Sequence, residues 1–287
     1  MTVSDIAPPR PGAPADRKRT PRPAWGLIVS LVVLGLFALA AVAPAVLATH
    51  SPTAQDFANA LRPPSAQFWF CTDEGGRDLY SRVVYGTRES LLIGVGAAGL
   101  AMVIAVVFGS VAALGDRVTA AVVNRVIEIA FAFPILLFAL LMVAILGPSA
   151  GTAILAVGIS TAPGYARMVR GQILAERNAG YVEAARALGH PRGRIIGQHI
   201  LPNAMRPLVA LFTMSIGQSI VWASGLAFLG LGVAPPSSEW GALLDAGRAY
   251  LLQAPWLTFI PGAVILVLAL AATTVGRRIQ NHLEKAQ

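Results

Sequence analysis

The chain has 287 residues, of which 55% are hydrophobic and only 13% are charged. Because a soluble domain carries about 25% charged residues, this composition excludes a water-soluble globular protein, and the long apolar runs exclude a disordered one. The net charge of +8 comes from basic residues that lie between or beside those runs, which indicates membrane topology rather than nucleic-acid binding.

The chain begins with a basic stretch and a long apolar run. Residues 1–24 hold five arginines and lysines, and we expect a disordered, cytoplasmic tail there. Residues 25–47 then follow without a charge. A secretory signal has a shorter apolar region, of about 7 to 15 residues, so a retained first transmembrane helix is predicted, with a cleaved signal as the alternative.

Residues 48–88 are polar and are expected to lie outside the membrane on the extracytoplasmic side. Cys71 is the only cysteine, so no intramolecular disulfide can form, and it is interpreted as an inert small residue. Four charged residues follow it closely. They either pair with one another above the membrane or contact another protein: Asp73, Arg77, Asp78 and Arg82.

Residues 89–278 are expected to form the transmembrane core. Each of five further uncharged runs suits a membrane-spanning helix, although one is short for the roughly 20 residues that a span requires. The sequence therefore predicts an all-α integral membrane protein with six transmembrane helices. The five runs are 91–114, 129–146, 150–166, 207–238 and 249–276.

The distribution of basic residues predicts the orientation, because arginine and lysine near span ends are retained in the cytoplasm. With the N-terminus inside, 17 of the 22 basic residues lie on the cytoplasmic side. Both termini are therefore expected to be cytoplasmic, including a C-terminal tail at 279–287. The loop at 167–206 lies on the same side.

The sequence lacks the residues that several kinds of chemistry require. A phosphate-binding loop needs a lysine after a glycine, and neither Lys18 nor Lys285 follows one, so any ATP must be hydrolysed by a partner. A secondary transporter usually keeps ionisable groups within its spans. Glu128, beside Arg125 at a span edge, is the one candidate here. The histidines show no metal-ligand spacing. No catalytic, metal or cofactor site is predicted.

The loop at 167–206 carries the most specific local pattern. Residues 181–188 are good helix formers, Gly189 suits the left-handed position that ends a helix, and Pro191 prevents continuation. A short protruding helix and an elbow are predicted. Tyr181, Ala185 and Leu188 share one face of it, and Glu183 and Arg186, three positions apart, can pair on another. Such a helix fits either a protein groove or the membrane surface.

This loop resembles the EAA loop of ABC-importer permeases. The resemblance rests on Glu183-Ala184-Ala185, then Gly189, then Ile200-Leu201-Pro202, at the family's spacing and between two spans. In that family the loop forms a coupling helix that docks in a cleft of an ATPase subunit. The residues that the resemblance assigns to coupling are Tyr181, Glu183, Ala184, Ala185, Arg186, Leu188 and Gly189.

The resemblance extends over about residues 68–276 and is closest to C-type permeases of the peptide/nickel importer group. It includes Thr72 to Leu91, and the run Phe228-Leu229-Gly230-Leu231-Gly232 with the prolines and tryptophans after it. Cys71 departs from it, because the family more often has glycine there, and the tail before Trp25 is not diagnostic.

The resemblance implies a type I importer permease fold in a prokaryotic cytoplasmic membrane. It implies four kinds of partner besides the lipid bilayer: a homologous B-type permease, two ABC ATPase subunits that hold ATP and Mg²⁺, and an extracytoplasmic substrate-binding protein. The charged residues after Cys71 would contact this binding protein. Dipeptides or oligopeptides are the expected substrate. The alternatives are the same role for nickel or another small solute, or a secondary transporter.

Overall fold

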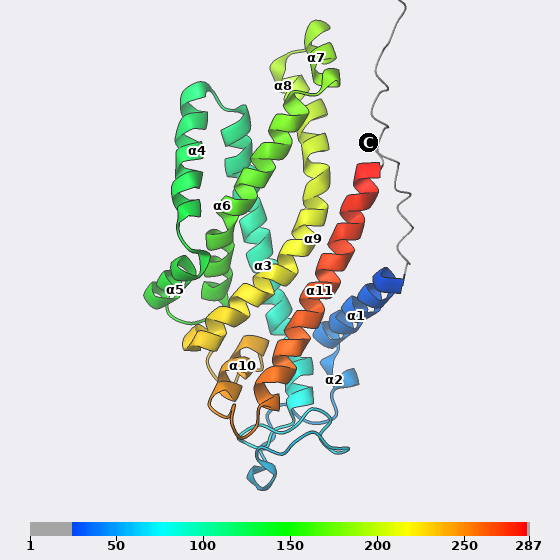
Figure 1. Ribbon diagram of the computed structural model, residues 1–287, viewed down its shortest axis with the longest axis vertical. Coiled ribbons are helices and arrows are strands. Elements are labelled where there is room, and N and C mark those ends of the chain that lie inside the picture. Colours follow the sequence, from blue (N-terminus) through cyan, green and yellow to red (C-terminus); the bar gives the residue numbers. More distant parts are fainter. Residues whose placement is uncertain (1–24, 286–287) are drawn as a thin grey trace, which may run out of the picture.

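The computed structural model describes residues 25–285, so the tail at 1–24 and the last two residues lie outside the described part. The chain forms a bundle of long helices with loops at both ends (Figure 1). Within the described residues there is no β-strand, only a single bridge between Thr72 and Asp78. The helices are α1 (Trp25–Val42), α2 (Pro44–Leu47), η1 (Phe57–Asn59), α3 (Leu79–Leu114), α4 (Arg117–Ala132), α5 (Ile135–Leu146), α6 (Ala150–Arg177), α7 (Gly180–Ala187), α8 (Arg192–Ile195), η2 (Ile196–Ile200), α9 (Leu201–Leu226), η3 (Ala227–Leu231), α10 (Trp240–Arg248) and α11 (Trp256–Lys285).

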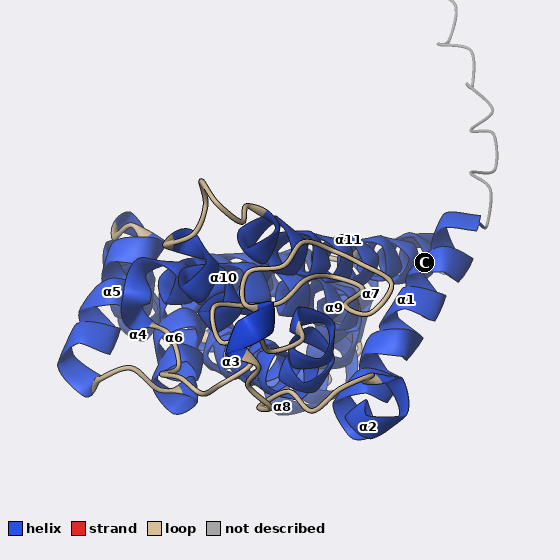
Figure 2. Cartoon of the chain, turned by 90° about the horizontal axis from the view of Figure 1, so that it is seen from below, coloured by secondary structure: helices blue, strands red, loops and turns tan. Residues whose placement is uncertain are grey.

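The long helices run in alternating directions between two ends of the molecule. In Figure 1, α3, α6 and α11 rise toward the end that carries α7 and α8, whereas α4 and α9 return from it. We name these the α7 end and the α10 end. Viewed along the bundle, α1 lies on one flank and α5 on the opposite one (Figure 2).

Four helical segments within residues 25–285 are long and apolar enough to cross a membrane, and a bent pair makes up to five. The four are Trp25–Val42, Leu79–Leu114, Arg192–Leu231 and Trp256–Leu283. Helix α6 is not among them, although it runs beside α3 in the bundle (Figure 1). The all-helical membrane class is confirmed, while the count of six spans stays a prediction.

The run at 129–146 is not one straight helix. Helix α4 begins at Arg117 and ends at Ala132, α5 begins at Ile135, and the two meet at 88°. Pro134 explains the break, because proline disfavours a helical conformation in the residue before it and lacks the amide that would continue the helix. Phe133 accordingly has an extended backbone, with ψ at 130°.

Helix α3 starts twelve residues before the apolar run that predicted it, at Leu79 rather than Leu91. Asp78 caps it, because its Oδ2 accepts a hydrogen bond from the Ser81 amide at 3.0 Å. Hydropathy shows where charged residues stop, not where a helix starts, so the sequence prediction places the charged turns at 79–88 in the preceding polar segment. Helix α3 has 36 residues.

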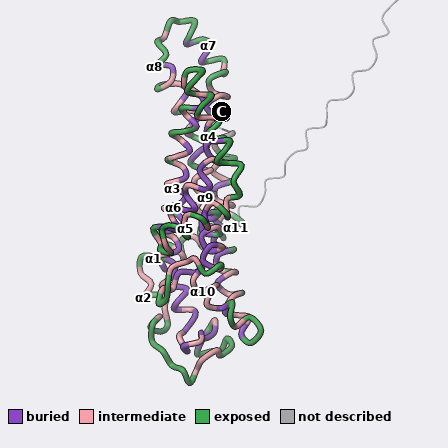
Figure 3. Tube along the Cα trace, turned by 90° about the vertical axis from the view of Figure 1, so that its left-hand side faces the viewer, coloured by how far each residue is buried: buried purple, intermediate pink, exposed green. Residues whose placement is uncertain are grey.

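Small residues allow the long helices to approach closely. Close packing is expected in a membrane, because the hydrophobic effect does not drive helices together in lipid. A Cβ atom on Gly109 of α3 would lie 2.8 Å from the carbonyl oxygen of Ala166 on α6. One on Gly217 of α9 would lie 2.9 Å from the Cα of Ala269 on α11. Burial is concentrated along the middle of the bundle, whereas α7 and the opposite loops are largely exposed (Figure 3).

Candidate functional site: the loop at the α7 end

The predicted short helix and elbow are present at the α7 end. Helix α7 covers Gly180–Ala187, and Gly189 follows it with φ at 78°, the left-handed conformation that glycine adopts without strain. The Gly189 amide donates to Arg186 O at 3.0 Å and the His190 amide to Ala185 O at 3.2 Å. These bonds satisfy carbonyls at the helix end and turn the chain sharply into α8.

One face of α7 is buried against the bundle. Val182 is fully buried and Ala185 is 6% exposed, and both pack into the apolar cluster that joins α3, α6 and the start of α9. Tyr181 and Leu188, by contrast, are exposed at 42% and 77%. The face expected to be shared by Tyr181, Ala185 and Leu188 is therefore divided, because the buried stripe runs through Val182 and Ala185.

The ion pair that the spacing of Glu183 and Arg186 allows is not formed within residues 25–285. Arg186 instead donates from Nη2 to the carbonyl oxygen of Arg177, at 3.3 Å. Within residues 25–285 the Glu183 side chain has neither a hydrogen bond nor an ion pair, and it is exposed together with Ala184. The outward surface of α7 thus presents one unpaired carboxylate beside a small residue.

Tyr181 links α7 to both neighbouring long helices. Its hydroxyl donates to the carboxylate of Glu176 at the end of α6 and accepts from Nδ2 of Asn203 on α9, at 3.2 Å. Burial and the hydrogen bond to Glu176 raise the pKa of Tyr181, which keeps the hydroxyl protonated as a donor. Sequence reasoning missed this three-residue link, because Glu176 and Asn203 lie outside the motif.

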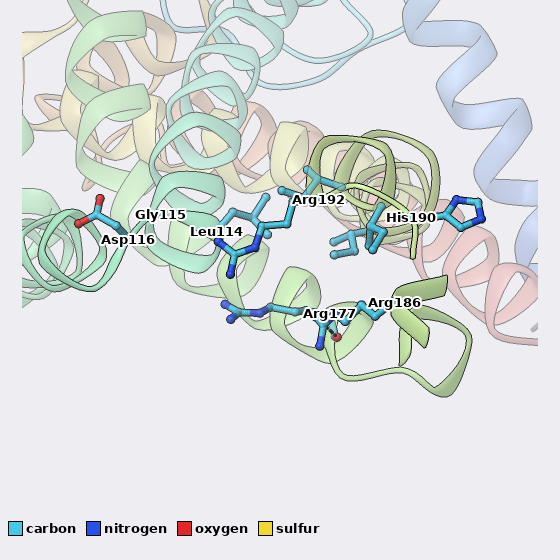
Figure 4. Close-up of a pocket in the computed structure, with 10 residues that line it drawn as sticks. Leu114, Gly115, Asp116, Arg177, Arg186, His190 and Arg192 are labelled. Carbon is cyan, nitrogen blue, oxygen red and sulfur yellow. Dashed lines mark hydrogen bonds between the residues drawn. The ribbon is translucent and has the colours of Figure 1, made fainter. Parts of the chain in front are cut away.

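A basic cavity of about 510 Å³ lies between this loop and the end of α3. Its lining residues are Leu114, Gly115, Asp116, Arg177, Arg186, His190, Arg192, Ile195, Ile196 and Ile200. In Figure 4 the guanidinium groups of Arg177 and Arg192 both extend toward the end of α3, whereas Asp116 and the ring of His190 point away from them. Arg177 also donates from Nη1 to Ala113 O at 3.0 Å.

The four charged residues after Cys71 form an internal network at the α10 end. Arg77 Nε and Arg82 Nη1 both contact Oδ2 of Asp73, at 2.7 and 2.5 Å. Asp78 accepts from the Ser81 amide as the cap of α3. Asp73, Asp78 and Arg82 are 4% exposed or less, so this arrangement favours internal pairing over contact with another protein.

The segment at 237–242, whose Trp240 belongs to the resemblance, packs against the start of α3, a contact that sequence reasoning did not predict. Arg82 Nη2 donates to Ser237 O at 2.9 Å, and Trp240, which is fully buried, donates from Nε1 to Val83 O at 3.0 Å. Glu239 caps α10 by accepting from the amides of Gly241 and Ala242, both at 2.9 Å. The residues of this contact are about 150 positions apart, so no local pattern could have found it.

Cys71 is expected to resist alkylation in the folded protein. The thiol is fully buried, and burial, with the charges of Asp73 and Asp78, raises its pKa far above the usual range. Since only the thiolate reacts, a maleimide should leave native Cys71 unmodified at pH 7.5 and at pH 9, yet modify it after denaturation. Mass spectrometry of the intact chain checks this, and rapid native labelling would contradict the burial described here.

Within residues 25–285, no three histidine, cysteine, aspartate or glutamate side chains are placed to hold a metal ion.

Residues 105–287 match the family described as "Binding-protein-dependent transport system inner membrane component". The chain is 37% identical to the dipeptide transport system permease protein DppC of Alkalihalophilus pseudofirmus, over 90% of this chain and 84% of that protein. It is 40% identical to the probable D,D-dipeptide transport system permease protein DdpC of Escherichia coli, over 90% and 86%. It is 35% identical to the glutathione transport system permease protein GsiD of Pectobacterium atrosepticum, over 88% and 84%.

Solved structures give the same fold. An inward-facing MetNI methionine ABC transporter aligns with a TM-score of 0.59 and 21% identity, over 70% of this chain and 96% of that one. An amino acid ABC transporter solved with histidines aligns with a TM-score of 0.59 and 16% identity, over 70% and 94%. The expected permease fold is thereby confirmed.

Proposed function

The chain belongs to the family of binding-protein-dependent transport system inner membrane components and is a C-type permease subunit, and from this premise we propose that it carries dipeptides or oligopeptides through an ATP-driven importer. The names of the three relatives above support a peptide substrate over nickel, because each names a dipeptide or glutathione. The subunit itself performs no bond chemistry and draws its energy from ATPase partners.

The observation that carries this proposal, beside the family, is the double attachment of α7. Tyr181 bonds to α6 through Glu176 and to α9 through Asn203, and Val182 and Ala185 bury the inner face of α7 in the apolar cluster between them. A force applied to α7 therefore reaches two membrane helices together. An exposed helix that is attached in this way suits docking to a subunit that changes shape when it binds ATP.

We assign the coupling role to the outward residues of this loop. Glu183 offers an unpaired carboxylate for charged hydrogen bonds, Ala184 allows close approach, and Gly189 sets the elbow. Closure of two ATPase subunits would push α7, tilt α6 and α9, and open the pathway that this subunit forms with a B-type permease. A binding protein would deliver the peptide at the α10 end.

We place the α7 end, and with it both termini, in the cytoplasm. The support is the excess of arginine and lysine in the segments assigned to that side, because positive residues near span ends are retained inside. The ATPases, which need cytoplasmic ATP, would then meet α7 directly.

Gentle affinity purification from the native membrane tests the assembly. We expect a second permease and two P-loop ATPases to co-purify, and ATP hydrolysis to rise when a binding protein loaded with peptide is added to the complex in vesicles. Peptide accumulation should require ATP. A partner-free chain that moves solute in vesicles without ATP would contradict the proposal.

A further inference from the structure

The basic cavity at the α7 end shares Arg186 with the residues that the resemblance assigns to coupling, and its other arginines have no role in the coupling described above. Three arginines from three different elements line it: Arg177 at the end of α6, Arg186 on α7 and Arg192 on α8. The apolar part of its lining is formed by Leu114 of α3 and by isoleucines of α8 and η2, and Asp116 and His190 complete the wall. A cationic rim over an apolar wall is suited to a ligand with both an anionic and an aliphatic part.

No carboxylate neutralises these arginines in the part of the chain that the structure describes. Asp116, the acidic residue of the lining, accepts hydrogen bonds from the amides of Val118 and Thr119, at 3.1 and 3.3 Å, and so caps α4. Arg177 and Arg186 each give one hydrogen bond to a main-chain carbonyl, and the Arg192 side chain makes no hydrogen bond or ion pair with any residue of the described range 25–285. Several guanidinium donors are therefore left, and like charges that face one cavity repel unless an anion enters it.

The cavity lies at the boundary of the apolar part of the bundle. The uncharged run of α3 ends at Leu114, and the first charged residues, Asp116 and Arg117, follow within three positions. Arg177 contacts Ala113 O at 3.0 Å, so the end of α6 is at the same level. Where an uncharged run ends and charged residues begin, the hydrocarbon of the bilayer gives way to the headgroup region, which holds the lipid phosphates.

We propose that this cavity binds a phosphate group, carried by the headgroup of an anionic phospholipid, between the end of α3 and the coupling loop. Arginine suits phosphate because its planar donors form paired hydrogen bonds with two oxygens. The apolar wall favours a lipid over free phosphate, since the first methylenes of an acyl chain would lie against Leu114 and Ile196. Basic cavities between membrane helices on the cytoplasmic side bind lipid headgroups by this chemistry.

Native mass spectrometry of the purified full-length chain in detergent tests the proposal. The probes are phosphatidylglycerol and phosphatidylcholine with the same acyl chains, and inorganic phosphate alone. Arg192→Gln should weaken phosphatidylglycerol binding by about fivefold, the ratio that matches about 1 kcal/mol per basic residue near an anionic surface. Phosphatidylcholine binding should not change.

Arg194→Gln is the matched control. Arg194 is also an exposed arginine of α8, but it bonds to Gln198 at 3.1 Å and does not line the cavity, so phosphatidylglycerol affinity should be kept. Arg186→Gln, on a different helix, should reproduce the loss seen for Arg192→Gln. Equal melting temperatures of the variants show that they are folded.

Four results would overturn the proposal. The first is equal binding of the two lipids by the unmodified chain, and the second is an equal loss in Arg192→Gln and Arg194→Gln. Another is Arg192-dependent binding of inorganic phosphate without any preference for phosphatidylglycerol, which would assign the cavity to free phosphate. The last is loss of ATPase co-purification in Arg192→Gln with unchanged lipid binding, which would make the cavity a subunit interface.

Discussion

Replacing Glu183 with lysine is expected to abolish ATP-driven peptide uptake while the complex continues to hydrolyse ATP. The Glu183 side chain is exposed and has no partner among residues 25–285, so the substitution should leave folding and membrane insertion intact. In a docked α7, however, the lysine would place an unmatched charge against groups that recognise a carboxylate. Breaking a desolvated charged pair costs about 3–5 kcal/mol, so uptake should fall by at least about tenfold.

The measurement compares peptide uptake and ATPase rate in the same vesicles. Glu183→Asp is the matched control, because it keeps the carboxylate and removes only one methylene group, and it should retain most of the uptake. Normal uptake by Glu183→Lys would disprove the coupling role. A loss of uptake that is accompanied by loss of the chain from the membrane would instead show that Glu183 is needed for folding.

Alanine at Gly86 is expected to destabilise the folded chain severely. A Cβ atom there would lie 1.7 Å from the backbone oxygen of Ser238 and 2.7 Å from its carbonyl carbon, and backbone atoms cannot rotate away. The segment at 237–241 would have to leave α3, together with the buried Trp240. We expect a loss of about 3 kcal/mol or more in the free energy of unfolding, the upper part of the range for overpacked sites.

Gly99→Ala, in the same helix, provides the comparison. Nothing lies within 4 Å of a Cβ atom at Gly99, and alanine favours a helix over glycine by about 1 kcal/mol, so this variant should be as stable as the parent or slightly more so. Thermal melting of both variants in the same detergent checks the prediction. Equal melting temperatures would show that the segment at 237–241 does not rest on α3 as described.

The sequence predicted the helical class and the elbow because each depends on local chemistry. Long uncharged runs identify membrane helices, and the glycine and proline after residue 188 determine where α7 ends. The same reasoning missed the start of α3, because hydropathy cannot distinguish a charged helical turn above the membrane from a loop. It also treated the run at 129–146 as one span, whereas the helix breaks and bends by 88° at Pro134.

The buried face of α7 could not be predicted from spacing alone. Two apolar stripes are possible on a helix with apolar residues at 181, 182, 185 and 188, and only the position of the bundle decides between them. For Asp73 the sequence left two alternatives open, and burial in the fold decides between them. Charged residues nine positions apart, Asp73 and Arg82, were expected either to pair or to face another protein, and burial in the fold favours the first.

The length of α3 and the firm contacts at its start have a mechanical consequence. Arg82 and Trp240 hold that start at the α10 end, which makes it a fulcrum, and the remaining helix is an unbroken lever arm. Thirty-six residues span about 54 Å, so a rotation of only about 5° would sweep the far tip through about 5 Å. This displacement of the helix tip matches the distance of about 4.8 Å between neighbouring extended strands, which is the width of one peptide backbone.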